Sequence, residues 1–481
     1  MNIAELVVFI IYLVAMVGIG LYFFVRQKGG NEKDYFLGGR QMGAWVSALS
    51  AGASDMSAWV LMGLPASIYA AGLGKAWIAI GLMIGYALSW IFEAPRLRRF
   101  SIEANDSITI PQYLTNRFLS KSKALQIICA VIFILAYTIY AASSIKACGT
   151  LFNTVLGMDP TVAMYLAAAI IIAYTFLGGF SAVCWTDFFQ GMLMLAALLI
   201  APIFAWSLLQ SGSVEASTAF PEHFWSLTAD WRDIVSGLGW GLGYFGMPHI
   251  IIRFMSLKSE KELKKSSAIG ITWTLIILVM SVASGCVGRM FLGEIADNST
   301  VFIQLTRRIF PPLVSGILLS AILAASMSTA DSQLLAASSA FASDVYKPVF
   351  RKKASDNEML WAGRAVVILI AIIALIIAAN PNSGTIMGLV ENAWGVFGAA
   401  FGPAILLSLF WRKLSFSGAV AGIVCGAVAD ILWLTCMSAT GVYEIIPGFA
   451  VGLIAAVIVS KMSGEPSPEV EALFDRASQP E

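Results

Sequence analysis

Apolar residues in this chain are gathered into long continuous blocks, and this pattern constrains the fold more than any other feature. A helix needs roughly 20 apolar residues to cross the hydrocarbon layer of a bilayer, and the blocks are close to or above that length. Of the 481 residues, 58% are hydrophobic and 12% are charged, whereas soluble domains carry roughly 25% charged residues. The sequence therefore predicts an all-α polytopic membrane protein and excludes a soluble globular domain.

We predict thirteen transmembrane helices from these blocks. They cover residues 5–25, 42–70, 73–95, 124–150, 159–178, 185–210, 231–255, 267–291, 311–344, 362–380, 385–411, 415–436 and 443–461. The first block follows no positive charge and is longer than a signal-peptide core, so we interpret it as a retained span. Segment 463–481 is polar, acidic and contains proline, which predicts a flexible cytoplasmic tail.

Lys and Arg are divided unevenly between alternate connections. Counted with the span ends that flank them, one set of connections holds 24 of these residues, Arg253 among them, and the opposite set holds 5. Lys146 lies inside a span and belongs to neither set. Because cytoplasmic connections carry the excess of Lys and Arg, we expect the N-terminus outside and the C-terminus in the cytoplasm. The net charge of +1 gives no global field that would attract nucleic acid.

Two of the blocks contain residues that interrupt a helix. Block 42–70 carries Asp55 within a polar patch, and block 231–255 carries a run of glycines followed by Pro248. Glycine weakens a helix and proline removes a backbone donor. Interrupted spans at matching positions are typical of transporters built from inverted repeats, although close packing on small residues also explains glycines in membrane helices.

The two interrupted blocks are five spans apart, so they run through the membrane in opposite directions. This is the arrangement that an inverted repeat of five plus five helices requires. The predicted organisation is a first transmembrane helix with a cytoplasmic loop, two repeats of five helices, two peripheral helices and the tail. The corresponding ranges are 1–41, 42–210, 231–411, 412–462 and 463–481.

Asp55 is the strongest single candidate for a functional residue, because a carboxylate at membrane depth is costly and usually serves a function. A structural ion pair with Lys146 is the alternative. In block 311–344, Ser328 and Thr329 share one helical face with Ala325 and Ser332. Such hydroxyls, with carbonyls freed nearby, form an all-oxygen shell that suits a hard cation. Hydroxyls that bond back to their own helix explain the same spacing.

Other candidates each allow two explanations. Asp187 lies at the predicted start of block 185–210, where it is either part of an ion site or an acid that favours a helix N-terminus. Tyr140, Trp240 and Tyr244 are either an aromatic pocket or packing residues. The sequence contains no nucleotide fingerprint, metalloenzyme spacing or nucleophile elbow, which argues against an enzyme.

The sequence resembles the sodium:solute symporter family over nearly its whole length, and within that family its bacterial sodium/proline branch. The matching stretches are Asp34–Arg40, Ser54–Ser57, Ala94–Arg98, the glycine motif Phe176–Phe180 around Gly178, Trp185–Asp187, Trp240–Gly246, Pro248–Ile250, Met327–Thr329, Gly398–Pro403 and Tyr443–Gly448.

The resemblance implies roles for individual positions. A sodium site would be formed by the carbonyls of Ala53, Met56 and Ala325 with the hydroxyls of Ser328 and Thr329. Asp55 and Ser57 would support sodium-coupled binding, and Asp187 would handle sodium as a supporting or transient site. The proline pocket would be lined by Tyr140, Trp240, Tyr244 and Pro248, with Ser57 beside it.

Three positions depart from the family pattern. Ala58 stands where glycine is expected after Ser57, and Met247 stands where the proline branch usually has glutamine. Asp331 adds an acid beside the sodium hydroxyls and leaves a second cation site open.

The resemblance therefore implies a secondary active symporter that couples sodium entry to uptake of L-proline by alternating access. Its setting would be a bacterial cytoplasmic membrane, with sodium as the coupling ion and proline and the lipid bilayer as partners. The alternatives are another carboxylate or a sugar-like substrate on the same scaffold, a membrane sensor, a membrane-embedded enzyme and a passive channel.

Overall fold

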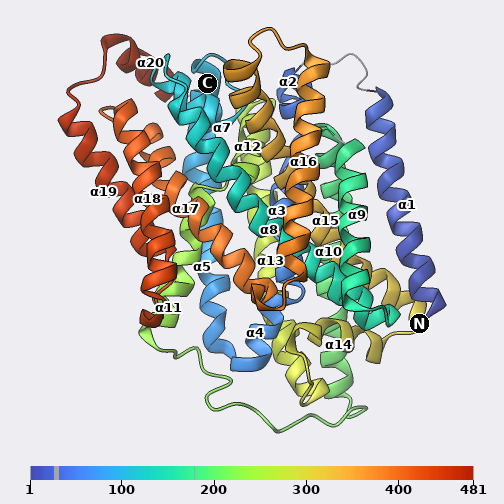
Figure 1. Cartoon of the computed structure of the whole chain (residues 1–481). Helices are drawn as coiled ribbons and strands as arrows, with labels where there is room; N and C mark the ends of the chain where they lie inside the picture. Colours follow the sequence, from blue (N-terminus) through green and yellow to red (C-terminus); the bar gives the residue numbers. More distant parts are fainter. Residues whose placement is uncertain (1, 27–31, 178, 480–481) are drawn as a thin grey trace.

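The chain folds into helices that run between two opposite ends of the molecule, with the N-terminus at one end and the C-terminus at the other (Figure 1). The computed structural model describes residues 2–26, 32–177 and 179–479, so Gly178 of the glycine motif lies outside the described residues. Within these ranges, β-type pairing is limited to one bridge between Met42 and Leu257.

Ten helices in the described part of the chain are long and apolar enough to cross a membrane. They are α1 (Ile3–Arg26), α5 (Trp77–Leu88) continued by α6 (Ala94–Glu103), α8 (Ala124–Leu156), α10 (Phe180–Gln210), α13 (Glu260–Leu292), α15 (Pro312–Ser339) continued by a π-helical segment (Ala340–Phe350), α16 (Asp356–Ala379), α17 (Ile386–Phe410), α18 (Phe416–Cys436) and α19 (Ile445–Met462). The all-α polytopic fold is thereby confirmed.

Of the three remaining predicted spans, one is a single helix and two are interrupted. Block 159–178 corresponds to α9 (Pro160–Leu177). Block 42–70 is divided into α3 (Ala44–Asp55), a 3₁₀ turn (Ala58–Val60) and α4 (Gly63–Ala71). Block 231–255 is divided into α11 (Trp231–Gly239), a 3₁₀ segment (Trp240–Phe245) and α12 (Pro248–Ser256). The count of thirteen spans stays a prediction, whereas both interruptions are present in the structure.

Four short helices lie at the two ends of the molecule (Figure 1). They are α2 (Glu32–Leu37), α7 (Ile110–Arg117), α14 (Val301–Ile309) and α20 (Pro468–Ser478).

The prediction of a flexible tail was wrong for most of its length. Residues of that segment form α20, which packs on α6 and α7. Its buried side chains Val470, Leu473, Phe474 and Ala477 follow the i, i+3, i+4, i+7 spacing of an amphipathic helix. The apolar stripe, which polar composition alone conceals, is the reason that this segment docks.

The two interrupted segments occupy related places among the other helices. α3 packs on α10 and α13, and the 3₁₀ segment 240–245 packs on α17 and α5. Each interrupted segment therefore contacts the last helix of its own predicted repeat and a helix of the other repeat. α3 and α12 also contact each other, which brings both interruptions to the centre of the molecule.

Glycine allows the second interrupted segment to approach α5 with backbone against backbone. A Cβ atom added to Gly81 would lie 2.1 Å from the carbonyl oxygen of Gly237, and one added to Gly85 would lie 2.1 Å from that of Gly241. Real Cβ atoms cannot come so close to backbone atoms, so no other residue fits these positions without moving a helix. The glycine run that suggested an interrupted helix therefore serves helix packing as well.

Candidate functional site

Asp55 is the last residue of α3, at the point where the first interruption begins. Met56, the next residue, has left helical geometry with φ −82° and ψ 78°. Ser57 caps the following 3₁₀ turn, where its hydroxyl accepts a hydrogen bond from the Trp59 amide at 3.4 Å. The carbonyl of Ala53 is freed by this break, because the Ser57 amide donates instead to the carbonyl of Asp55.

Two of the predicted aromatic residues meet at Asp55. The Tyr244 hydroxyl donates a 2.5 Å hydrogen bond to Oδ2 of the Asp55 carboxylate. The Tyr140 hydroxyl donates to the Asp55 carbonyl at 3.2 Å, and the indole of Trp59 donates to the same carbonyl at 3.2 Å. All four side chains are buried. Asp55 is thus bonded to residues of the second interrupted segment and of α8.

The ion pair that was the alternative for Asp55 is absent. Lys146 donates hydrogen bonds to the Ser383 hydroxyl at 3.2 Å and to the Gly384 carbonyl, near the end of α16. A cation held at that loop is not the partner of Asp55, so the ion-pair explanation was wrong.

Trp240 and Pro248 lie at the two ends of the same stretch as Tyr244. Pro248 is the first residue of α12 and is buried. Trp240 is buried against the ring of Tyr443, with ring centroids 5.1 Å apart, and its carbonyl accepts a 2.8 Å hydrogen bond from the indole of Trp394. The Trp394 ring also packs edge-on against Tyr244, at 5.0 Å between centroids.

A cavity of about 370 Å³ reaches Trp240 from the end of the molecule where α4 and α11 lie. Its wall includes Ser236, Glu391 and Tyr443. This cavity connects one of the predicted pocket residues with the end that carries the N-terminus (Figure 1).

The oxygen atoms predicted to bind sodium are gathered beside the break in α3. The Ser328 hydroxyl lies 2.7 Å from the Ala53 carbonyl oxygen and 3.2 Å from that of Ala325, and the Thr329 hydroxyl lies 3.4 Å from that of Ala53. All of these residues are buried. Met56, the fifth predicted donor, is buried at the same break. A donor set of carbonyl and hydroxyl oxygens is the kind that hard cations prefer, so the residues present fit a sodium ion.

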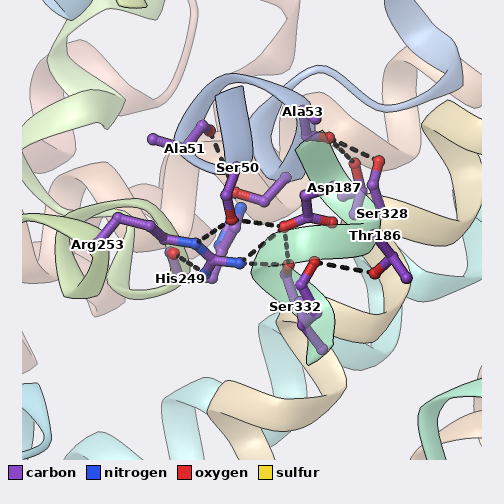
Figure 2. Close-up of polar contacts among 12 residues, drawn as sticks. Ser50, Ala51, Ala53, Thr186, Asp187, His249, Arg253, Ser328 and Ser332 are labelled. Carbon is purple, nitrogen blue, oxygen red and sulfur yellow. Dashed lines mark hydrogen bonds and ion pairs between the residues drawn. The ribbon is translucent and has the colours of Figure 1, made fainter. Parts of the chain in front are cut away.

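Asp187 lies two turns into α10, because the helix begins at Phe180 and not at the predicted residue 185. The explanation as an acid at a helix N-terminus is therefore wrong. The side chain is fully buried, and its Oδ2 atom lies 3.2 Å from Nη2 of Arg253. That oxygen also accepts a 2.7 Å hydrogen bond from the Ser50 hydroxyl (Figure 2).

Arg253 is the functional candidate that sequence reasoning missed. The charge count assigned it to a cytoplasmic connection, but its side chain is 2% exposed. Its guanidinium donates to the hydroxyls of Ser50 and Ser332, at 3.1 Å and 2.6 Å, and to the His249 carbonyl (Figure 2). The sequence did carry a signal for this pair: an arginine inside one apolar block and an acid inside another, both of which need a partner if they are buried.

Asp331, which leaves a second cation site open, is fully buried on α15 between Ser328 and Ser332. Asp331, Asp55 and Asp187 are thus three buried acids on the helices that carry or adjoin the Ala53–Ser328–Thr329 oxygens. Charged groups at this depth are expensive unless they serve binding or transport.

Ten apolar helices among the described residues, two interrupted helices at the centre and buried oxygen donors at the interruptions define a helical membrane transporter. The chain belongs to the sodium:solute symporter family, whose sequence profile matches residues 35–426.

Individual relatives cover almost the entire chain. The high-affinity proline transporter PutP of Bacillus subtilis is 42% identical over 94% of this chain and 97% of its own length. The osmoregulated proline transporter OpuE of the same organism is 44% identical over 96% of each chain. The sodium/proline symporter of Escherichia coli is 42% identical over 98% of this chain and 96% of its own.

Solved structures share the fold. A substrate-bound, outward-open Na⁺-coupled sialic acid symporter matches with a TM-score of 0.77 at 21% identity, covering 97% of this chain and 99% of its own. Mhp1, a nucleobase-cation-symport-1 family transporter in a closed conformation, matches with a TM-score of 0.56 at 14% identity, covering 92% and 97%. At these identities the likeness concerns the arrangement of helices.

Proposed function

We propose that this protein couples the entry of sodium to the uptake of L-proline by alternating access. The observation that carries the proposal is the contact between the two interrupted segments. Tyr244 of the second segment is bonded to Asp55 of the first, two residues from the Ala53 carbonyl that lies against Ser328. An ion and a solute bound here would each order groups that the other needs. Relatives named as proline transporters at 42–44% identity support the choice of substrate.

Sodium, which is a transported ion and not a resident cofactor, would bind to Ala53, Met56, Ala325, Ser328 and Thr329. In the ion-bound state the two hydroxyls would direct their lone pairs at the cation instead of donating hydrogen bonds to the Ala53 carbonyl. Asp55 lies in the same turn and would add negative charge to the region. This binding would fix the end of α3 and the start of the following 3₁₀ turn.

Proline would occupy the region between Ser57, Tyr140, Trp240, Tyr244 and Pro248. Interrupted helices expose backbone N–H groups and the positive ends of helix dipoles, which suit a carboxylate. Aromatic faces would hold the apolar pyrrolidine ring. Because each ligand orders the site of the other, the coupling is reciprocal: sodium tightens proline binding by the same factor as proline tightens sodium binding.

We further propose that the protein lies in a bacterial cytoplasmic membrane with its N-terminus outside. The cavity that reaches Trp240 opens at the end that carries the N-terminus. It would therefore be the entry route from the outside. Rocking of one helix bundle against the other would then close this route and open the opposite end.

Uptake of labelled proline into membrane vesicles tests the proposal. An inward sodium gradient should accelerate uptake, and replacement of sodium by choline should abolish the acceleration. Uptake that is equally fast without sodium would contradict the proposal. Competition by a panel of unlabelled amino acids, other carboxylates and sugars distinguishes proline from the alternative substrates.

A further inference from the structure

A polar cavity of about 440 Å³ lies at the end of the molecule where α7 and the C-terminus are found (Figure 1). It is formed mainly by α7, the start of α8 and the π-helical segment Ala340–Phe350 that continues α15. Three lysines line it, Lys123, Lys347 and Lys352, and the described part of the lining contains no acidic residue. Small-molecule pockets have volumes of about 300–1,000 Å³. The cavity therefore has the charge and the size to hold an anionic group.

The start of α8 adds to the positive charge of this cavity. Lys123 occupies the N-cap position of this 33-residue helix, and no acidic residue lies in its first turn. A helix N-terminus carries a partial positive charge, which acidic side chains or bound anions stabilise and which a lysine opposes. Asp344 of the π-helical segment is buried, accepts a 2.9 Å hydrogen bond from the Thr109 hydroxyl and is not part of the lining. The lining itself thus supplies no negative charge to this helix end.

Two buried polar groups also face the cavity. Oε1 of Gln126, in the first turn of α8, and Oγ of Ser343 have no hydrogen-bond partner among the described residues, and each residue is 6% exposed. Buried polar groups in proteins are almost always hydrogen-bonded, so each exception needs an explanation. A phosphate oxygen can accept a hydrogen bond from the Ser343 hydroxyl, and from the Gln126 amide once that group turns over. An anion that accepts hydrogen bonds therefore satisfies both groups.

An apolar stripe leads away from this cavity along the surface of α8. Ile127, Val131 and Leu135 follow Lys123 at intervals of four residues, so the four side chains form one row along the helix. The three apolar side chains are 38%, 50% and 63% exposed, and exposed apolar residues on a membrane-spanning helix face the hydrocarbon layer. A free phosphate makes no use of this stripe, whereas an acyl chain packs along it while its headgroup lies at Lys123.

We propose that the cavity binds the phosphate headgroup of an anionic phospholipid, and that one acyl chain of this lipid lies on the Ile127–Val131–Leu135 stripe. The three lysines attract the headgroup, and Gln126 and Ser343 donate hydrogen bonds to its oxygens. Basic pockets between membrane helices bind such headgroups in other proteins. The lipid holds together α7, α8 and the continuation of α15. This site is separate from the proposed transport site, so the inference does not depend on which solute is carried.

Thermal unfolding of the delipidated protein in a non-ionic detergent tests the proposal, because a ligand that binds the folded state raises the unfolding midpoint. Dioctanoyl phosphatidylglycerol and dioctanoyl phosphatidylcholine are added in parallel titrations at low ionic strength. We expect a saturable increase with phosphatidylglycerol and a much smaller one with phosphatidylcholine, whose headgroup carries its own positive charge. Equal increases for the two lipids would overturn the proposal.

Soluble anions distinguish the lipid from a free phosphate. Inorganic phosphate and glycerol 3-phosphate carry the negative charge but have no acyl chain. At the concentrations at which phosphatidylglycerol saturates, we expect neither to raise the midpoint. An increase as large as that with the lipid would mean that the cavity takes up free anions and that the stripe contributes nothing, which contradicts the proposal.

The triple variant Lys123→Gln, Lys347→Gln and Lys352→Gln removes the positive charge of the lining. One lysine near an anionic lipid changes the affinity by about fivefold. We therefore expect the phosphatidylglycerol concentration that gives half of the maximal increase to rise by about tenfold or more. An unchanged concentration would show that the lipid binds elsewhere and would refute the proposed site.

A matched control removes the same charge from another part of the same end. Lys258, Lys261 and Lys264 are exposed at the start of α13 and do not line the cavity. The triple variant Lys258→Gln, Lys261→Gln and Lys264→Gln should keep the parental half-maximal concentration. If both triple variants shift it equally, the effect comes from the overall charge of the protein, and the cavity is not the binding site.

Discussion

The Tyr244 hydroxyl donates a 2.5 Å hydrogen bond to the Asp55 carboxylate, and in doing so it connects two helix interruptions that are 189 residues apart in the chain. Asp55 ends the helical part of the first interrupted segment, and Tyr244 lies in the 3₁₀ part of the second. One hydrogen bond therefore links the region proposed for sodium with the region proposed for proline.

Tyr244→Phe tests this link because it removes only the hydroxyl. A lost hydrogen bond to a charged group costs about 1.5–3 kcal/mol, so we expect sodium-dependent proline binding to weaken by about tenfold or more. Equilibrium binding of labelled proline at fixed sodium measures the change. Tyr86→Phe is the control, since the Tyr86 ring packs edge-on against Tyr244 at 5.2 Å between centroids. Equal losses in the two variants would speak against a specific role of the Tyr244 hydroxyl.

Thr329→Ala should raise the sodium concentration needed for half-maximal proline uptake. The substitution removes one oxygen from the proposed ion shell, for which we expect about a fivefold increase, the scale of one neutral hydrogen bond. Uptake rates measured over a series of sodium concentrations give the value. Ser326→Ala, which removes another buried hydroxyl from α15, serves as the control. An unchanged sodium dependence in Thr329→Ala would argue against the ion site.

Replacement of Trp240 by alanine should weaken proline binding more than sodium binding. Trp240 lines the 370 Å³ cavity and its ring packs on Tyr443, so its loss removes an aromatic face from the proposed pocket. Burial of a whole aromatic side chain is worth several kcal/mol, and a ligand that packs on one face of it gains a fraction of this energy. We therefore expect the proline affinity to fall by about tenfold. Separate titrations with proline and with sodium distinguish the two effects. A parallel loss of both affinities would indicate a folding defect.

Phe474→Ala should destabilise the docking of α20. The ring packs edge-on against Phe100 at 5.3 Å between centroids, and the Arg117 guanidinium lies 4.9 Å from its centroid. Removal of a buried phenyl ring costs about 3 kcal/mol when the site cannot collapse. The midpoint of thermal unfolding in detergent should therefore fall, while Phe474→Leu should lower it less. Identical midpoints for the wild type and Phe474→Ala would contradict a packed tail.

Sequence reasoning reached the features that depend on local pattern. Apolar blocks predicted the long helices, and Asp55 and Pro248 marked both interruptions, because each signal lies within a single segment. It also brought together Ala53, Ser328 and Thr329, although this grouping came from resemblance and not from spacing. The hydrogen bonds in the structure are compatible with that grouping.

The features that were missed depend on tertiary contacts. Arg253 and Asp187 are 66 residues apart, and neither position reveals its partner. Arg253 was counted with the cytoplasmic connection that follows its block, because charges at the end of an apolar block usually lie at the membrane surface. The docking of α20 was missed because a short amphipathic stripe in a polar segment is visible only once a partner surface is known.

The contact between α5 and the second interrupted segment has a consequence for evolution. On an ordinary helix surface alanine is the mildest replacement, and larger side chains are progressively worse. At Gly81, Gly85, Gly237 and Gly241 backbone atoms of the facing segment already fill the space, so the smallest addition collides with them. A fitness map of this chain should therefore show four sites at which alanine is as harmful as tryptophan. Positions that tolerate only glycine would therefore identify the contact between these two helices in any homologous sequence, without a structure.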